Sequence, residues 1–522
     1  MTKAVPPPLP LRTKIAVGGA MLGAFMAVLN IQVINTSLPE IQGGIGAGLE
    51  DGGWISTSYL IGEIIVIPLS GWLVEVFSMR RYFIGSTVLF LFFSAACGLA
   101  ANFPEMVVLR LLQGFTGGAL IPLAFTCLIT LLPERARPTG FAAYALTVTF
   151  APAIGPTIGG AITDLYGWRS IFFLNLVPGA VMLSALLWGL NPAPMQLQKF
   201  RRGDWLGIAT IAIGPGSLQI VLEEGNKDDW FSSPLIFRLS IVAAIALSAF
   251  LFQELRPGNR APLVNLRLFT RWNFALGCFT SVILGFVLYA AVYLIPIYLA
   301  EAHGYSARQA GNVMAWIGLP QLIIIPFMPY LMRRFDPRYL LMGGFVLFSI
   351  SCFWNINLGP QDSGPQLLIP NLIRALGQAM IFPPITLIVT AGIPLADSGS
   401  ASSLFNMLRN LGGAIGIAMV QTFITNREKF HSAIMMPHIS LLNPATRQRL
   451  ALLQHYFAAR GISGPQDARH AAIIAIGRTV RAQAFYLAYG DAFALLGAFM
   501  ITGVLVIAFL QKPAGRAAPG GH

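Results

Sequence analysis

About fourteen separate stretches of about 18 to 27 mostly apolar residues follow one another along this chain of 522 residues. A helix that crosses the hydrocarbon core of a bilayer, about 30 Å thick, needs about 20 such residues, because its backbone must form all its hydrogen bonds internally. Only 11% of the residues are charged, so little of the chain remains for a soluble catalytic domain. The sequence therefore predicts an all-α polytopic membrane protein.

An even number of spans places both ends of the chain on the same side of the membrane. Lys and Arg are concentrated in cytoplasmic loops. With the amino terminus inside, most of the 34 Lys and Arg residues fall on inner segments, and the short outer loops hold only Arg169, Lys227, Arg238 and Arg308. We therefore expect both termini in the cytoplasm. The predicted spans are 15–38, 53–75, 82–101, 104–126, 140–164, 170–190, 205–224, 236–253, 273–299, 308–331, 338–357, 366–392, 400–425 and 485–510.

The net charge of +13 would indicate nucleic-acid binding in a soluble protein. Here the cations lie along one membrane face, which favours contact with the lipid bilayer and no nucleic-acid partner. Phosphate-binding loops, hydrolase motifs, zinc-protease motifs and dinucleotide-binding fingerprints are all missing from the sequence. The four cysteines and the histidines show no metal-like spacing. We expect no enzyme, no cofactor and no metal, and a transport process driven by an ion gradient.

Two long basic segments, 191–204 and 254–272, separate a pair of spans from six spans before and six after. The predicted domains are a six-helix bundle over 1–190, two inserted transmembrane helices over 191–272, and a second six-helix bundle over 273–522. Arg110 with the following Gly114 and Pro122 is echoed by Arg374 with Gly377 and Pro383, each time in the fourth span of six. Parallel repeats of this kind are typical of secondary transporters, whose sites lie near the midplane between the halves.

Several motifs occur in order and on the expected spans. They are GWLVEVFSMRR at 71–81, LRLLQGFTGGALIP at 109–122, APAIGPTIGGAI at 151–162, WRSIFFLNL at 168–176, GDWLG at 203–207 and LRNLGGAIGIA at 408–418. Together they make the chain resemble the fourteen-span drug:proton antiporters of the EmrB/QacA group in the major facilitator superfamily, over nearly its whole length.

The resemblance implies a major facilitator fold and a proton-coupled antiporter that exports hydrophobic or amphiphilic drugs across a bacterial cytoplasmic (inner) membrane. The implied partners are small hydrophobic or amphiphilic substrates and protons. In Gram-negative relatives they also include a periplasmic membrane-fusion adaptor and an outer-membrane channel.

The stretch 151–162 is a helix with small residues on one face and bendable points, so that a neighbouring helix can approach closely. Its four key positions are Gly155, Pro156, Gly159 and Gly160. The resemblance implies that this antiporter motif closes the outer side against ion leak. Ordinary close helix packing is the alternative.

The turn after the second predicted span supplies the expected inner gate, formed by Gly71, Glu75, Arg80 and Arg81. A carboxylate that faces basic groups of a neighbouring span or loop can hold the inner side of such a transporter closed. The sequence departs from the family pattern, with Glu75 in place of Asp, Val76 in place of a basic residue and Ser78 in place of Gly. The ion pair is therefore expected to be weakened or rewired, and a simple positive anchor is the alternative.

Ionisable groups within membrane spans are functional candidates by default. Glu63 lies about 15 Å below the outer end of the second span, and Arg110 lies about 9 Å below the outer end of the fourth. A group at this depth whose charge changes with access to each side is what a proton carrier needs. The family usually carries Asp where Asn30 stands, so we expect Glu63 to carry the proton, with Arg110 reaching Glu63 or the first span. The alternative is that Glu63 merely neutralises Arg110.

The expected substrate cavity takes polar residues from the first, fourth, twelfth and thirteenth spans. They are Asn30, Gln32, Asn35, Gln113, Arg374 and Arg409. Arg374 and Arg409 would meet an anionic substrate or the coupling network, or else bind carbonyl groups at helix breaks as structural residues.

The outer segment 426–484 is expected to be a long periplasmic loop that contains one amphipathic helix, because Leu450, Leu453 and Phe457 recur at helical spacing before Gly461. This helix would lie on the membrane or dock a partner.

Two other functions stay open. The arginines within spans favour an exporter of anionic amphiphiles such as fatty acids, and the missing Asp at Asn30 favours a non-transporting membrane receptor or scaffold.

Overall fold

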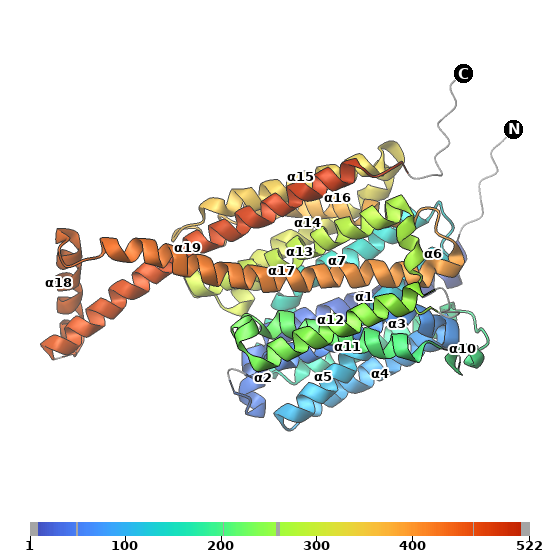
Figure 1. The fold of residues 1–522 in the computed structure, drawn as a ribbon, viewed down its shortest axis with the longest axis horizontal. Coiled ribbons are helices and arrows are strands. Elements are labelled where there is room, and N and C mark those ends of the chain that lie inside the picture. The colour runs from blue at the N-terminus through green and yellow to red at the C-terminus, as the bar shows by residue number, and fades with distance from the viewer. Residues whose placement is uncertain (1–8, 49–50, 202, 257–261, 463, 513–522) are drawn as a thin grey trace, which may run out of the picture.

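The computed structural model describes residues 9–48, 51–201, 203–256, 262–462 and 464–512. All regular structure in these ranges is helical, and fourteen helical segments are long and apolar enough to cross a membrane. This confirms the predicted all-α protein with fourteen spans (Figure 1).

The spans fall into the predicted order of six, two and six. The first six are α1 (Leu11–Thr36), α3 (Trp54–Phe77), α4 (Met79–Leu99), α5 and α6 (Phe103–Gly117 and Leu120–Leu131), α7 (Arg137–Tyr166), and α8 and α9 (Ser170–Phe173 and Leu176–Gly189). The next two are α11 (Trp205–Glu224) and α12 (Pro234–Leu255). The last six are α13 (Trp272–His303), α14 (Ala307–Arg334), α15 (Pro337–Trp354), α16 (Leu368–Thr390), α17 (Ser398–Met435) and α19 (Pro465–Ala508).

Short elements connect these spans. They are α2 (Leu38–Ile45), α10 (Leu197–Arg201), α18 (Pro444–Ala459) and the 3-10 turns η1 (Trp230–Ser232), η2 (Leu266–Thr270), η3 (Asn355–Asn357), η4 (Leu395–Asp397) and η5 (Met436–His438).

Local sequence signals set several span boundaries. The α13 helix ends at Gly304, whose φ of 66° is a conformation that glycine adopts at low cost. Two residues later, the Ser306 hydroxyl accepts a hydrogen bond from the backbone of Gln309, and the Gln309 side chain accepts one from the backbone of Ser306. This capping box begins α14, so the two helices form an antiparallel pair with a short connection.

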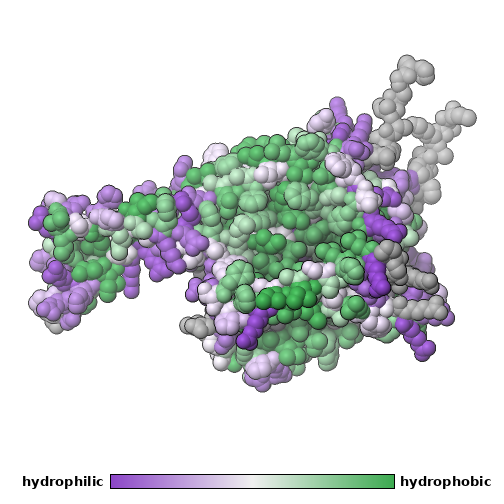
Figure 2. Space-filling view, viewed as in Figure 1, coloured by the Kyte–Doolittle hydropathy of each residue, from purple (hydrophilic) through white to green (hydrophobic). Residues whose placement is uncertain are grey.

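The two ends of the bundle are named here from the positions of the first and last spans. The inner end is where α1 begins and α19 ends, and the outer end is the opposite one, from which α18 projects (Figure 1). The space-filling view shows an apolar band over the spans, with polar residues gathered at the inner end and on the projection (Figure 2).

The two sets of six spans meet at both ends of the bundle. Near the outer end α7 packs along α14, and near the inner end α17 packs against α3 and α6. The inserted helix α11 packs on α12, on α3 and on α17, so the inserted pair lies beside the junction of the two sets. We propose the predicted division at residues 190 and 272 on this basis, and call the two sets the first half and the second half.

The segment 426–484 is not the long loop that we expected. The α17 and α19 helices continue beyond the bundle, and with α18 they form a helical hairpin that projects from the outer end (Figure 1). The predicted helix around Leu450 is present as α18, and Gly461, with φ 96°, follows its carboxyl end.

Ion pairs tie the base of the hairpin together. Arg427 Nε lies 2.6 Å from Asp491 Oδ2, and His431 Nε2 lies 2.7 Å from the same oxygen. A third contact, 3.7 Å long, joins Arg481 to Glu428. Each pair links α17 to α19, so the arms of the hairpin are held together where they leave the bundle.

Candidate functional site

Arg110 on α5 is the centre of a hydrogen-bond network in the first half, and it is only 1% exposed. Its Nη1 atom donates to Asn30 Oδ1 at 2.9 Å and to Gln113 Oε1 at 2.7 Å. Its Nε atom donates to the carbonyl oxygen of Ile55 at 3.1 Å, and the guanidinium lies 4.3 Å from the centre of the Tyr59 ring. Arg110 therefore reaches the first span through Asn30, which is one of the two contacts that we expected.

Glu63 on α3 is 4% exposed and faces the second half of the molecule. Its Oε1 atom accepts a hydrogen bond of 2.9 Å from Asn410 Nδ2 on α17. The Tyr289 hydroxyl on α13 donates to the other end of this amide, Asn410 Oδ1, at 3.4 Å. Glu63 Oε2 has no hydrogen-bond partner within the described ranges. A buried carboxyl group of one half is thus held by an amide of the other half.

The described residues contain no ion pair between Glu63 and Arg110, so direct neutralisation of Arg110 by Glu63 is absent from this structure. Arg409 on α17, which is 1% exposed, exerts the larger electrostatic effect on Glu63. Its guanidinium also interacts with the hydroxyls of Tyr144 and Tyr289. The arginine with the stronger electrostatic interaction with Glu63 therefore belongs to the opposite half.

Arg374 on α16 is fully buried, with no exposed side-chain surface. None of its three guanidinium nitrogen atoms has a hydrogen-bond partner within the described part of the chain. The guanidinium lies 5.3 Å from the centre of the Phe348 ring on α15. The carbonyl contacts that we considered for Arg374 are therefore not formed.

A small cavity of about 20 Å³ lies between the two halves. Gln32 and Thr149 line it from the first half, and Tyr289 and Gln378 line it from the second. This volume is about that needed by one water molecule. This cavity between the halves is therefore too small for a substrate of the predicted class.

The residues predicted for the substrate cavity are not gathered in one place. Gln32 lines the central cavity, and Asn30 and Gln113 belong to the Arg110 network. Asn35 is exposed near the outer end, where its Oδ1 atom accepts a hydrogen bond from Ser56 at 2.6 Å. Arg409 lies by Glu63, and Arg374 lies apart on α16.

The glycines of the stretch 151–162 allow close contacts on two sides of α7. A β-carbon at Gly155 would lie 2.5 Å from Gln32 Cβ, and one at Gly159 would lie 2.8 Å from the Val33 carbonyl oxygen on α1. On α14, a β-carbon at Gly311 would lie 3.1 Å from the carbonyl carbon of Pro156. Gly160 faces Arg308 of α14 at ordinary contact distance. This segment therefore packs the outer ends of α1, α7 and α14 together.

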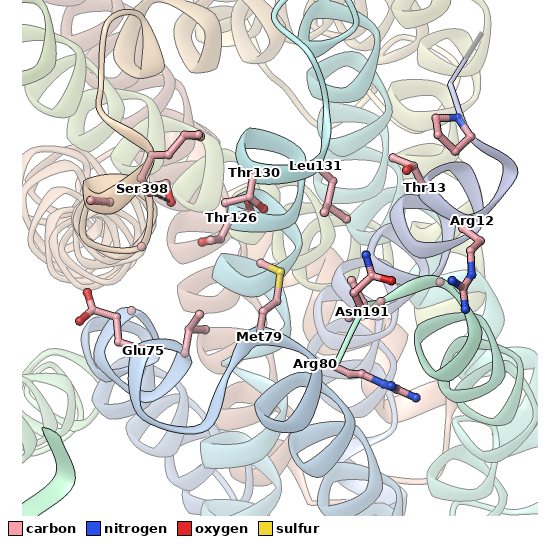
Figure 3. A pocket seen from close by; sticks show the side chains of 18 of the residues that line it. Arg12, Thr13, Glu75, Met79, Arg80, Thr126, Thr130, Leu131, Asn191 and Ser398 are labelled. Atoms are coloured by element: carbon pink, nitrogen blue, oxygen red, sulfur yellow. Dashed lines mark hydrogen bonds between the residues drawn. The ribbon is translucent and has the colours of Figure 1, made fainter. Parts of the chain in front are cut away.

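At the inner end the halves are joined through α3 and α17. A β-carbon at Gly71 would lie 3.0 Å from the carbonyl carbon of Gly399, and the hydroxyls of Ser70 and Ser403 are 3.1 Å apart. Near this contact is a cavity of about 760 Å³. In Figure 3, Glu75 and Ser398 lie on one side of it, and Arg12 and Arg80 lie on the other.

The charged residues of the predicted gate are bound by an inner connecting segment and by a span of the first half. Glu75 forms an ion pair of 2.8 Å with Lys199 on α10, and both side chains are about half exposed. Arg80 Nη2 donates to the Leu187 carbonyl oxygen at 2.9 Å, and Arg81 is exposed. The carboxylate of Glu75 is thus held by the segment that leads to the inserted helices.

Asn410 and Tyr289 were not among the residues predicted to contact Glu63. Asn410 lies within the motif at 408–418, directly after Arg409, so its position gave a signal that was available. Tyr289 lies in a long apolar run with no distinguishing pattern. Its role follows only from the packing of α13 against α17.

Known proteins similar to this chain were found at the level of family, sequence and structure. The family model of the Major Facilitator Superfamily matches residues 20–417. Multidrug export protein EmrB of Escherichia coli strain K12 is 34% identical over 434 residues, which cover 83% of this chain and 84% of that protein. Fatty acid resistance protein FarB of Neisseria gonorrhoeae is 30% identical over 502 residues, which cover 96% of each chain.

Among solved structures, the human organic anion transporter MFSD10 (TETRAN) is similar, with a TM-score of 0.59, 16% identity, and coverage of 95% of this chain and 100% of that one. At this identity the likeness concerns the fold alone. Together with the family match and the sequence relatives, it confirms the resemblance that the motifs indicated. The chain belongs to the Major Facilitator Superfamily of membrane transporters.

Proposed function

We propose that this chain exports small hydrophobic or amphiphilic compounds in exchange for protons. The observation that carries the proposal is the hydrogen bond between Glu63 of the first half and Asn410 of the second. A titratable group at the junction of two moving halves can link its own charge to their relative position. Multidrug export proteins among the sequence relatives support the same direction and class of transport.

The coupling step uses the difference between the two charge states of Glu63. Asn410 donates to Glu63, and such a bond is stronger when the acceptor is ionised. The difference is about 1 kcal/mol, which changes an equilibrium about fivefold. Arg409 adds an attraction that also depends on the charge of Glu63. Protonation of Glu63 therefore weakens the contact between the halves and favours their separation.

Separation can occur at either end of the bundle. At the outer end the glycines of α7 pack against α1 and α14, and at the inner end Gly71 packs against Gly399. Opening one contact while the other stays closed gives access from one side at a time. In this proposal Pro156 and Gly160, which face α14, close the outer path, while Gly155 and Gly159 hold α7 against α1. Closing the outer side is the role that the antiporter motif implies.

We propose that the inner end faces the cytoplasm and that the protein lies in a bacterial inner membrane with both termini cytoplasmic. The distribution of Lys and Arg supports this orientation. The cavity of about 760 Å³ then opens toward the cytoplasm and serves as the substrate entrance. Arg12, Arg80 and Lys199 line it and give it a basic character.

The test uses the purified chain in liposomes with an imposed pH gradient. A fluorescent hydrophobic amine and a medium-chain fatty acid are offered separately, so that cationic and anionic amphiphiles are compared. The proposal predicts that the amine moves in the direction opposite to the protons. A protonophore, which dissipates the pH gradient, should abolish this movement. If neither compound moves and its addition causes no proton flux, the result supports a receptor or scaffold function.

An exporter of anionic amphiphiles is the second candidate function. The buried and unpartnered Arg374 favours it, and a fatty acid resistance protein is among the relatives. In the same assay this function predicts transport of the fatty acid in preference to the amine.

We further propose that the outer hairpin docks a periplasmic adaptor. The hairpin projects beyond the bundle (Figure 1) and exposes large apolar side chains. They are Leu441, Leu442, Leu452, Tyr456, Ile473 and Ile474. Exposed apolar side chains gathered on one projection are typical of an interaction surface.

Replacing residues 440–470 by a short Gly/Ser linker tests the hairpin while keeping the ion pairs at its base. Transport by the chain alone in liposomes is expected to persist, and resistance in cells with an outer membrane is expected to fall. The double substitution Leu452→Ser and Tyr456→Ser should act in the same direction without shortening the hairpin. Equal loss in liposomes and in cells would contradict docking and would place the hairpin in the transport path.

A further inference from the structure

Arg374 is a buried cation without a counterion. Its guanidinium has no exposed surface, and none of its nitrogen atoms meets an acceptor within the described ranges. Buried polar groups in proteins are almost always hydrogen-bonded, and buried charges are paired. We propose that Arg374 is the core of an anion-binding site in the second half, which takes one small monovalent anion or a carboxylate group.

Arg374 forms no ion pair with an acidic side chain in the part of the chain that the structure describes. The Cys352 thiol on α15 interacts electrostatically with it. Asn355 caps the carboxyl end of α15, three residues after Cys352, and its buried Nδ2 atom has no acceptor among the described residues. The second half therefore holds a further unpartnered buried donor besides the guanidinium of Arg374.

The geometry of the guanidinium selects the class of ligand. The Phe348 ring lies 5.3 Å from it as a cation–π contact, which engages the face of the planar group. The donors of a guanidinium lie in its plane, where they match a carboxylate or a halide. Because Arg374 carries one positive charge in an apolar setting, a monovalent anion neutralises it and a divalent anion leaves excess charge.

Asn371 offers the neutral alternative. It precedes Arg374 by three residues on α16, and its Oδ1 atom accepts no hydrogen bond from the described residues. Its Nδ2 atom donates to the carbonyl oxygen of Val313 on α14 at 3.3 Å, which holds the side chain toward that helix. An amide would satisfy a donor of Arg374 without removing its charge, so this alternative predicts that stability does not depend on anions.

The proposal predicts that anions stabilise the folded protein. The purified full-length chain in detergent is unfolded by heat in sodium sulfate, whose divalent anion does not fit the site, and sodium chloride or sodium octanoate is added at constant ionic strength. We expect the melting temperature to rise saturably, by roughly 3 °C at 100 times the dissociation constant. Arg374→Gln should abolish the rise, and Arg333→Gln, which removes an exposed arginine of the same half, should retain it.

Two results would overturn the proposal: no anion dependence in the natural chain, or the same dependence in Arg374→Gln. If Arg374→Gln does not fold, Arg374→Lys keeps the charge but not the planar fork, and its affinity should fall about tenfold. Unchanged affinity in Arg374→Lys would also contradict the site.

The two ligands distinguish the source of the anion. Protection by chloride alone identifies a resident inorganic ion, whereas stronger protection by octanoate identifies the carboxylate of an amphiphilic substrate. The substrate assignment alone rests on the proposed function, and it predicts that Arg374→Gln loses octanoate transport and retains transport of the hydrophobic amine. Failure of all transport would remove the substrate assignment and leave the binding result unaffected.

Discussion

Two arginines occupy equivalent places in the two halves and differ in what surrounds them. Arg110 and Arg374 lie in the fourth span of each half, both fully or almost fully buried, each over an aromatic ring. Arg110 donates to two side-chain oxygens and one carbonyl oxygen, and Arg374 donates to no described residue. The arginine is thus present at the equivalent position in both halves, but its hydrogen-bond acceptors are present only in the first half among the described residues.

The second spans of the two halves differ in the complementary way. Glu63 begins the segment EIIVIP, and Gln321 begins the similar segment QLIIIP on α14. Glu63 contacts Asn410 of the opposite half, whereas Gln321 donates to Gln378 of its own half at 2.7 Å. In our proposals the first half holds the group that titrates, and the second half holds an amide at that position and a cation that binds an anion. On this account the two halves of one repeat divide proton and anion chemistry between them.

The largest expected effect comes from a matched pair of substitutions to methionine. Arg110→Met removes the charged donor to the buried oxygens of Asn30 and Gln113 and to the Ile55 carbonyl, so we expect a loss of about 3 to 5 kcal/mol in unfolding free energy. Arg374→Met removes an unpaired buried charge, so the change should be within about 1 kcal/mol or stabilising. Thermal unfolding in sodium sulfate measures both free energies, and equal losses in the two variants would contradict the difference between Arg110 and Arg374.

A smaller effect is expected at the contact between the halves. Asn410→Leu removes the donor to Glu63 and should cost about 1.5 to 3 kcal/mol, because the bond involves an ionisable group. The rate of proton-coupled transport should fall by more than the loss of stability explains, because in our proposal the strength of this contact depends on the charge of Glu63. Gln378→Leu, which breaks the equivalent amide contact within the second half, is the matched control and should retain coupling. If both variants lose coupling equally, Asn410 has no special role.

The smallest effect is expected for the second carboxylate of α3. Glu75 pairs with Lys199, but both side chains are about half exposed. Exposed ion pairs contribute about 0 to 1 kcal/mol. Glu75→Gln should therefore leave stability unchanged within about 1 kcal/mol and transport within about twofold. A loss comparable to that of Asn410→Leu would show that the inner ion pair, and not the buried contact, controls the halves.

Most of the fold was predictable because each span must satisfy its backbone internally and remain apolar. Fourteen apolar runs in the sequence correspond to fourteen spans in the structure. The outer hairpin was not predictable in the same way. Its arms are polar continuations of α17 and α19, and they stay helical because α17 packs on α19 and α19 packs on α18, which is a tertiary effect.

For the candidate site, the sequence predicted how deep each side chain lies in the membrane but not which neighbouring helix it faces. Counting residues along a helix locates Glu63 and Arg110 along the membrane normal, and it leaves open which neighbour each one faces. The sequence therefore allowed Arg110 to reach either Asn30 or Glu63, and the packing of α5 against α3 and α1 decides for Asn30. Likewise, Lys199 lies far from Glu75 in the sequence and could not be chosen among the many inner cations.

The central claim is that Glu63 carries the exchanged proton, and substrate-driven proton movement tests it most directly. The purified chain is placed in liposomes that contain a pH-sensitive dye, and a gradient of the hydrophobic amine is imposed without a pH gradient. We expect proton movement opposite to the amine in the natural chain. Glu63→Gln keeps the shape and the hydrogen bond to Asn410 but cannot titrate, so it should bind the amine and move no protons. Undiminished proton movement in Glu63→Gln, with its fold verified by thermal unfolding, would contradict the account.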